Sequence, residues 1–260
     1  MKKIDLGNQS LTVAPGNLWA EIDVERLYLH ENRLSSVPEV IGSLRRLCVL
    51  DLGHNQLVGL PDSLGDLQEL EFLYLCDNKL GKLPSSLANL SKLIYLNISD
   101  NPLGVLPEWM GDLRNLIELR IYHAGLKSLP GSIGELAPLK ELHVQGNKLT
   151  ALPPSIGKLS SLRRLNLEAN QLETLPDSIK GLINLKELNL RNNNISSVPE
   201  SIGMLNNLET LDLRANQLTQ LPASLADLPK LEKLDLRWND LTTPLDWIDK
   251  LIARDCVVYL

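Results

Sequence analysis

The sequence predicts an α/β solenoid, with parallel strands along one face and short helical or 3-10 turns along the other. The first observation behind this prediction is a 23-residue pattern that recurs without insertion or deletion as eleven repeats over residues 1–253. The second is its content: apolar residues hold positions 1, 4, 6, 11, 14, 18 and 21, asparagine holds position 9 and proline holds position 15, as residues 162–184 illustrate. A short fixed period indicates repeats that bury their apolar edges only against their neighbours.

Each repeat is predicted to begin with a short strand. At positions 4 and 6, leucine alternates with polar neighbours, as in Leu165, Asn166 and Leu167, which is typical of a strand with one buried face. Stacked repeats would pair these strands in parallel, roughly 4.8 Å apart. Positions 3, 5, 7 and 8 would then project from the inner, concave face.

Asparagine at position 9 is expected to satisfy backbone groups where the chain leaves the strand, because its amide both donates and accepts hydrogen bonds. The residues at this position are Asn32, Asn55, Asn78, Asn101, Asn147, Asn170, Asn193, Asn216 and Asn239. Gln9 replaces asparagine in the first repeat and Ala124 in the sixth, and the pattern leaves open whether Ala124 bends the stack. Proline at position 15, displaced to Pro244 in the last repeat, is expected in the first turn of each helical segment.

One repeat domain is predicted over 1–260. It comprises a degenerate amino-terminal cap (1–23), regular repeats (24–230), and a last repeat with a carboxy-terminal cap strand (231–260). In that cap strand the period places core residues at Val257 and Tyr259. Nothing in the pattern leaves room for a catalytic domain, so we expect none.

Composition excludes several classes of function. The net charge of −6 and the lack of a basic run disfavour nucleic acid and anionic membranes as partners. We expect no transmembrane helix, because no apolar run reaches 18 residues, and no classical signal peptide at the start of the chain. The scattered cysteines Cys48, Cys76 and Cys256 are typical of a reducing compartment, and a cytoplasmic location is expected.

The motif LxxLxLxxNxLxxLPxxIGxLxx resembles that of leucine-rich repeat proteins along nearly the whole chain. Its LPxxIG half is similar to the intracellular Ras-group class and to bacterial 23-residue repeats. The resemblance implies a horseshoe-shaped arc and a non-catalytic, cofactor-free scaffold for a protein or peptide partner, for example a small GTPase or a signalling enzyme. The alternative is a secreted bacterial effector that is translocated into a host cell and targets a host protein.

Positions 3, 5, 7 and 8 carry nine of the ten Tyr, Phe and His residues, and repeats two to seven hold all nine. The preference of strands for aromatic residues explains only part of this bias. Register predicts a row of Val49, Phe72 and Tyr95, with Asp51 flanked by two tyrosines. The predicted partner-binding residues, called here the aromatic patch, are Tyr28, His30, Val49, Asp51, His54, Phe72, Tyr74, Cys76, Tyr95, Tyr122, His123 and His143.

The same positions in later repeats carry charges of both signs. One interpretation is a solvated face of weak ion pairs, and the other is a rim that orients the partner electrostatically. The residues of this secondary rim are Arg164, Glu168, Arg191, Arg214, Arg237 and Trp238.

Three further hypotheses come from the same register. His30, His54, Cys76 and His123 share one face, but their spacing follows the repeat and several lie two or more strands apart, roughly 10 Å, so no metal site is predicted. Cys76 as a nucleophile would require a lowered pKa. On the outer turns, Trp109 and Trp247 replace smaller residues, which indicates either convex packing or self-association; a monomer is expected.

Overall fold

The computed structural model describes residues 2–242 and 245–260, so the predicted displacement of Pro244 lies outside the described residues. The chain divides into two compact parts, an N-terminal half (residues 1–125) and a C-terminal half (residues 126–260). The single domain over 1–260 stays a prediction. Within the described residues, no helix is long and apolar enough to span a bilayer.

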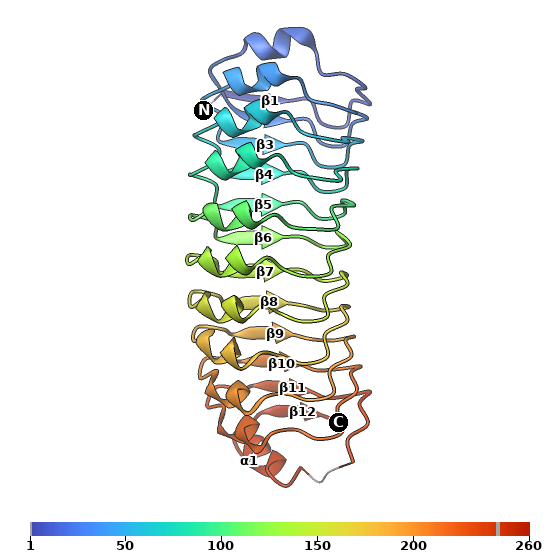
Figure 1. Ribbon diagram of the computed structural model, residues 1–260, viewed down its shortest axis with the longest axis vertical. Helices are drawn as coiled ribbons and strands as arrows, with labels where there is room; N and C mark the ends of the chain where they lie inside the picture. Colours follow the sequence, from blue (N-terminus) through green and yellow to red (C-terminus); the bar gives the residue numbers. More distant parts are fainter. Residues whose placement is uncertain (1, 243–244) are drawn as a thin grey trace. The chain divides into compact units, whose positions relative to one another are not determined.

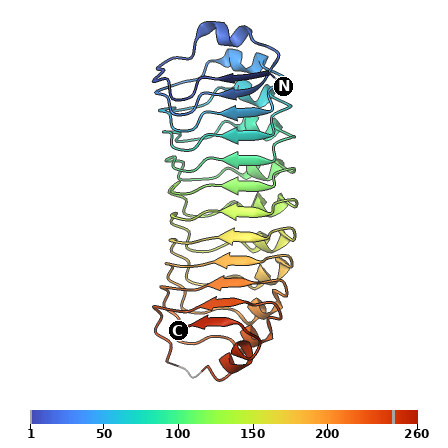
Figure 2. The ribbon, with the colours of Figure 1, turned by 180° about the vertical axis from the view of Figure 1, so that it is seen from behind.

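The N-terminal half alternates parallel strands with 3-10 turns, as predicted. In chain order it contains β1 (Lys2–Asp5), η1 (Gly16–Ala20), β2 (Val24–Tyr28), η2 (Glu39–Ser43), β3 (Val49–Asp51), η3 (Asp62–Asp66), β4 (Phe72–Tyr74), η4 (Ser85–Asn89), β5 (Tyr95–Asn97), η5 (Glu108–Asp112) and β6 (Glu118–Arg120). Each strand pairs in parallel with the next. Figures 1 and 2 show the turns on one side of this half and the strands on the other.

The C-terminal half repeats this arrangement until its last strand. It contains η6 (Gly131–Glu135), β7 (Glu141–His143), η7 (Pro154–Lys158), β8 (Arg164–Asn166), η8 (Asp177–Gly181), β9 (Glu187–Asn189), η9 (Glu200–Met204), β10 (Thr210–Asp212), η10 (Ala223–Asp227), β11 (Lys233–Asp235), α1 (Ile248–Ile252) and β12 (Val257–Tyr259). The predicted strand and turn solenoid is therefore confirmed. In strands β2 to β11 the leucine of each strand faces the core, as Leu50 and Leu188 illustrate.

The prolines stand one residue earlier than predicted, at the N-cap of each turn. Pro61, for example, has an extended backbone (φ −70°, ψ 147°), and its carbonyl accepts the N–H of Leu64 at 3.2 Å. The fixed φ of proline fits this extended cap as well as the first helical residue. The turn therefore depends on the proline carbonyl as an acceptor.

The asparagine at position 9 makes the predicted bonds between repeats. Asn78 Nδ2 donates to the carbonyls of Leu52 and Leu75 at 3.0 and 3.1 Å, and its Oδ1 accepts the N–H of Leu57 at 2.9 Å. At Ala124 the methyl side chain cannot accept the corresponding N–H, that of Leu103. The Leu103 N–H donates to Asn101 O instead, at 2.8 Å.

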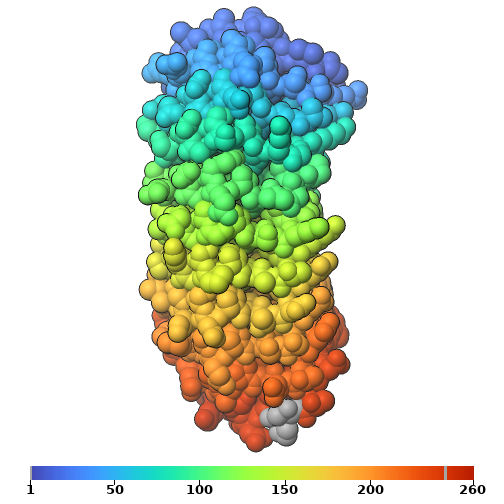
Figure 3. All heavy atoms as spheres, viewed as in Figure 1, coloured from blue at the N-terminus to red at the C-terminus, as the bar shows by residue number. Residues whose placement is uncertain are grey.

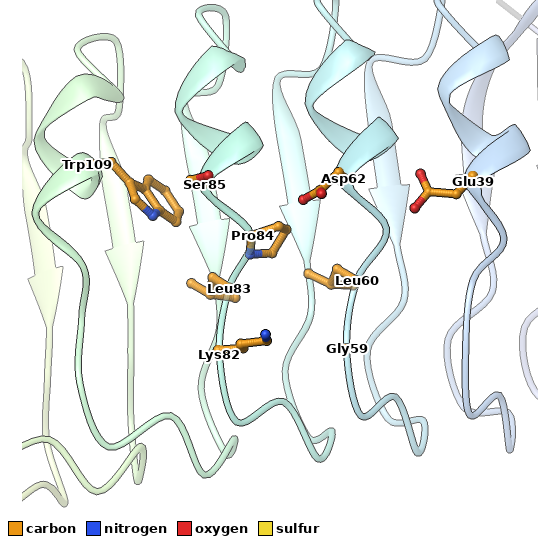
Figure 4. Close-up of a pocket in the computed structure, with 9 residues that line it drawn as sticks. All are labelled: Glu39, Gly59, Leu60, Asp62, Lys82, Leu83, Pro84, Ser85 and Trp109. Carbon is orange, nitrogen blue, oxygen red and sulfur yellow. The ribbon is translucent and has the colours of Figure 1, made fainter.

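The turns stack tightly because a glycine in one repeat faces a serine in the next. A Cβ added to Gly65 would lie 2.2 Å from Ser86 O. Where alanine replaces this glycine, at Ala88 and Ala226, the next repeat carries Trp109 or Trp247 in place of the serine. Figure 4 shows the Trp109 indole reaching from η5 toward Ser85 at the start of η4, which favours convex packing over self-association.

The predicted core positions of the last strand are wrong. Val258 pairs with Leu234, whereas Val257 and Tyr259 are 49% and 41% exposed. One extra residue separates β11 from β12, because α1 replaces a 3-10 turn and Asp255 follows it with a left-handed backbone (φ 63°). A one-residue slip turns every side chain to the opposite face, so Tyr259 joins the exposed face of the strands.

Candidate binding surface

Eleven of the twelve residues of the aromatic patch lie in the N-terminal half, on or just after β2–β6. Their side chains flank buried leucines and are half-buried or exposed, never buried. Register brings together the predicted row of Val49, Phe72 and Tyr95. His143 alone lies in the C-terminal half, on β7, with Nε2 3.1 Å from a carboxylate oxygen of Glu141.

The rings of the patch contact one another across strands. The centroids of Tyr74 and Tyr95 are 4.8 Å apart, and those of Phe72 and Tyr95 are 6.3 Å apart. The Arg120 guanidinium lies 5.8 Å from the Tyr95 ring centroid. Burial raises the pKa of Tyr95 to about 12, so its phenol is neutral at physiological pH. These rings form a continuous apolar surface with polar edges.

The histidines of this half contact carboxylates of adjacent repeats. His54 Nδ1 lies 2.9 Å from Asp77, and His123 Nδ1 lies 2.9 Å from Asp100. In the described part of the chain, neither these two histidines nor His30 and Cys76 belong to a group of three possible metal ligands within 4.8 Å. Burial also raises the pKa of the Cys76 thiol to about 11, which disfavours the thiolate that a nucleophile needs.

A hollow of about 430 Å³ opens between the first strands of the patch. Its walls come from two rows of adjacent strand positions: Arg26, Val49 and Phe72 in one, and Tyr28, Asp51 and Tyr74 in the other. Sequence reasoning missed Arg26. Its place at position 3 of β2, in line with Val49 and Phe72, was the available signal.

Asp51 is the acidic residue that lines the hollow, and its side chain is only 21% exposed. Its Oδ1 accepts the N–H of Gly53 at 3.0 Å, and its Oδ2 faces His30 Nδ1 at 3.4 Å. Burial raises the pKa of Asp51 above its usual range, although the Gly53 N–H opposes this shift. The ionised carboxylate is therefore held here at a cost in stability.

We expect Asp51→Asn to raise the melting temperature at pH 7 and to have little effect near pH 3. As pH rises, the unfolded chain releases the Asp51 proton before the folded protein does, so ionisation favours unfolding. Asparagine keeps an acceptor for Gly53 N–H without the charge. Thermal unfolding at the two pH values checks this, and a lower melting temperature at pH 7 would contradict it.

The rim residues of the C-terminal half are paired within the protein. Arg164 bridges Glu141 and Glu187 at 3.1 and 3.0 Å. The remaining arginines form ion pairs as follows: Arg191 with Glu168 at 3.6 Å, Arg214 with Asp212 at 2.5 Å, and Arg237 with Asp235 at 2.6 Å. Such pairing favours the solvated face over a rim with free charges.

Two aromatic residues stand at the end of this charged face. Trp238 is 64% exposed, has a left-handed backbone (φ 61°) and lies 5.7 Å from the Arg237 guanidinium. The same guanidinium lies 4.8 Å from the Tyr259 ring. The predicted secondary rim includes Trp238, whereas the 23-residue period placed Tyr259 in the core, so sequence reasoning missed only Tyr259 of these two aromatic residues.

The turn side of the N-terminal half carries a different hollow, of about 500 Å³. Figure 4 shows its lining, which includes Glu39, Asp62, Lys82 and Trp109. Figure 3, viewed from this side, shows successive repeats as successive bands of surface. Charges of both signs at its edge indicate no single ligand chemistry, so the aromatic patch is the stronger candidate.

Models of leucine-rich repeats match the sequence over most of its length. A leucine-rich repeat region matches residues 76–188, and a leucine-rich repeat model matches residues 22–80 and 183–241. The chain is a leucine-rich repeat protein, a family that is typically non-catalytic. No curated protein matches the chain in sequence.

Solved structures share the fold. A plant peptide hormone receptor, RGFR1, in complex with RGF2, is 30% identical, with a TM-score of 0.80 over 100% of this chain and 47% of that one. The Arabidopsis receptor kinase HAESA, in complex with the peptide hormone IDA and the co-receptor SERK1, is 32% identical (TM-score 0.77; 92% and 42% covered). The functional domain of InlJ from Listeria monocytogenes, at 24% identity, shows the fold alone (TM-score 0.82; 99% and 52% covered). The chain thus spans about half the length of each of these three solved chains.

Proposed function

We propose that this protein is a non-catalytic scaffold that binds a partner protein or peptide through the aromatic patch of its N-terminal half. The observation that carries the proposal is the contact of Phe72, Tyr74 and Tyr95 across adjacent strands on an exposed face. Large rings with polar tips dominate the binding energy of protein interfaces. A contiguous apolar surface of this kind is typical of an interaction site.

The similar plant receptors support a polypeptide as the ligand, because one is described as a peptide hormone receptor and the other is described in complex with a peptide hormone. Two finer hypotheses fall within this proposal. A Ras-group scaffold would bind a small GTPase or a signalling enzyme in the cytoplasm, whereas an effector would bind a host protein.

Replacing Phe72, Tyr95 and Tyr122 together by alanine is expected to weaken partner binding at least tenfold, about 1.4 kcal/mol. Folding should survive, because all three side chains point away from the core. The measurement is affinity capture with the intact chain, followed by titration of the captured partner with both proteins.

Val58→Ala is the matched control, since Val58 is 66% exposed and lies on the loop after β3. It should bind as the unaltered protein does. If the triple variant captures the partner with unchanged affinity, the aromatic patch is not the binding site.

A further inference from the structure

We propose that the hollow between β2, β3 and β4 receives an arginine side chain of the partner, whose guanidinium binds Asp51 between Tyr28 and Tyr74. The inference rests on the proposed function and adds the chemistry that the partner must present. The described contacts of Asp51, the tyrosine walls and the place of Arg26 carry it.

One carboxylate oxygen of Asp51 is available as a hydrogen-bond acceptor. Its Oδ1 is occupied by Gly53 N–H, whereas Oδ2 faces His30 Nδ1 at 3.4 Å, a nitrogen without a hydrogen-bond partner among the described residues. Oδ2 is thus left without a hydrogen bond in the part of the chain that the structure describes. A largely buried carboxylate with a free oxygen is stabilised most by a charged donor.

The aromatic side chains that line the hollow favour binding of a cation. Register places Tyr28 and Tyr74 on either side of Asp51, and Phe72 closes the hollow beside Tyr74. Aromatic faces around a carboxylate attract a cation both through the ring quadrupole and through the opposite charge. The hollow of about 430 Å³ is open enough to admit a side chain from outside.

The protein already uses this pairing beside the hollow. Lys3 Nζ lies 4.7 Å from the Tyr28 ring centroid and 3.1 Å from Asp5. Arg120 lies over Tyr95 and is hydrogen-bonded to Glu118. In each case a cation lies over a tyrosine and is paired with a carboxylate, the same combination that Asp51 and its tyrosines offer to a partner.

Arginine fits better than lysine, because its planar guanidinium stacks on aromatic rings and is weakly hydrated. Arg26 adds a positive charge to the lining of the hollow, on the row that contains Val49. Its Nε has no hydrogen-bond partner among the described residues. Its charge repels an incoming cation and confines it to the Asp51 side. Removal of the Asp51 charge should therefore weaken binding of the arginine, whereas removal of the Arg26 charge should strengthen it.

The test is selection of a random peptide library on the intact chain, followed by titration of the enriched peptide with Asp51→Asn and Arg26→Gln. We expect enrichment of one arginine, at least tenfold weaker binding to Asp51→Asn, and severalfold tighter binding to Arg26→Gln. Citrulline in place of the arginine should weaken binding as much as Asp51→Asn does, because it keeps the shape and loses the charge. Thermal unfolding confirms that both variants fold.

The outcomes separate this inference from the function on which it rests. Peptides that need Phe72, Tyr95 and Tyr122 but bind Asp51→Asn or the citrulline version unchanged would overturn the arginine site and leave the aromatic patch in place. Peptides that depend on neither set of residues, or no enriched peptide at all, would contradict both.

Discussion

Gly65→Ala is expected to destabilise the N-terminal half by about 3 kcal/mol, at the upper end of what overpacking costs. The added Cβ would lie 2.2 Å from Ser86 O and 2.7 Å from the Ser86 carbonyl carbon. Both atoms belong to the backbone of η4, so a side-chain rotation cannot relieve the clash. The turns must separate, and the buried leucines beneath them lose packing.

Gly59→Ala is the matched control in the same repeat. A Cβ at Gly59 would meet nothing within 4 Å. This change is expected to be neutral or to stabilise by up to about 1 kcal/mol, through the lower entropy of the unfolded chain. Denaturant unfolding of both variants measures the difference. Equal midpoints would show that close stacking of the turns does not limit stability.

Asn78→Ala is expected to destabilise the same half by about 3 kcal/mol, because it leaves a buried donor without a partner. The Leu57 N–H donates to Asn78 Oδ1 at 2.9 Å, and that bond would be lost outright. The carbonyls of Leu52 and Leu75 each lose one of two asparagine donors, since Asn55 and Asn101 also donate to them. The donor, more than the carbonyls, therefore decides the effect.

The exposed side chain of Asn89, on η4, provides the control, and Asn89→Ala should change stability by less than about 0.5 kcal/mol. Amide hydrogen exchange adds a local measurement, because the Leu57 amide should exchange faster in Asn78→Ala alone. Unchanged exchange at Leu57 would contradict the role given to Asn78. Ala124 is tolerated only with a rearranged turn, in which Leu103 N–H bonds to Asn101 and Gly104 adopts a positive φ (69°).

The 23-residue period predicted the strands, the turns and the asparagine ladder because all three follow from local packing of one repeat on the next. It failed at β12, where the connection changes from a 3-10 turn to α1 and gains one residue. A strict period carries no information about such a change. The exposure of Tyr259 could therefore be learned only from the strand pairing.

The repeat period also made part of the candidate site predictable. Register predicted which side chains lie in rows, and the structure confirms the row of Val49, Phe72 and Tyr95. The hollow beside Asp51 was not predictable, because it depends on the volumes and tilts of neighbouring side chains. The place of Arg26 in the row of Val49 and Phe72 does follow from the register, although the hollow that it borders does not.

The claim that the exposed strand face of the N-terminal half binds the partner is tested most directly by photo-crosslinking. An aromatic photoreactive residue fits at Val49, since the adjacent strands carry Phe72 and Tyr95 at the same position. We predict that it crosslinks to the captured partner, while the same residue at the exposed loop position of Val58 does not. Crosslinks from Val58 without crosslinks from Val49 would contradict the account.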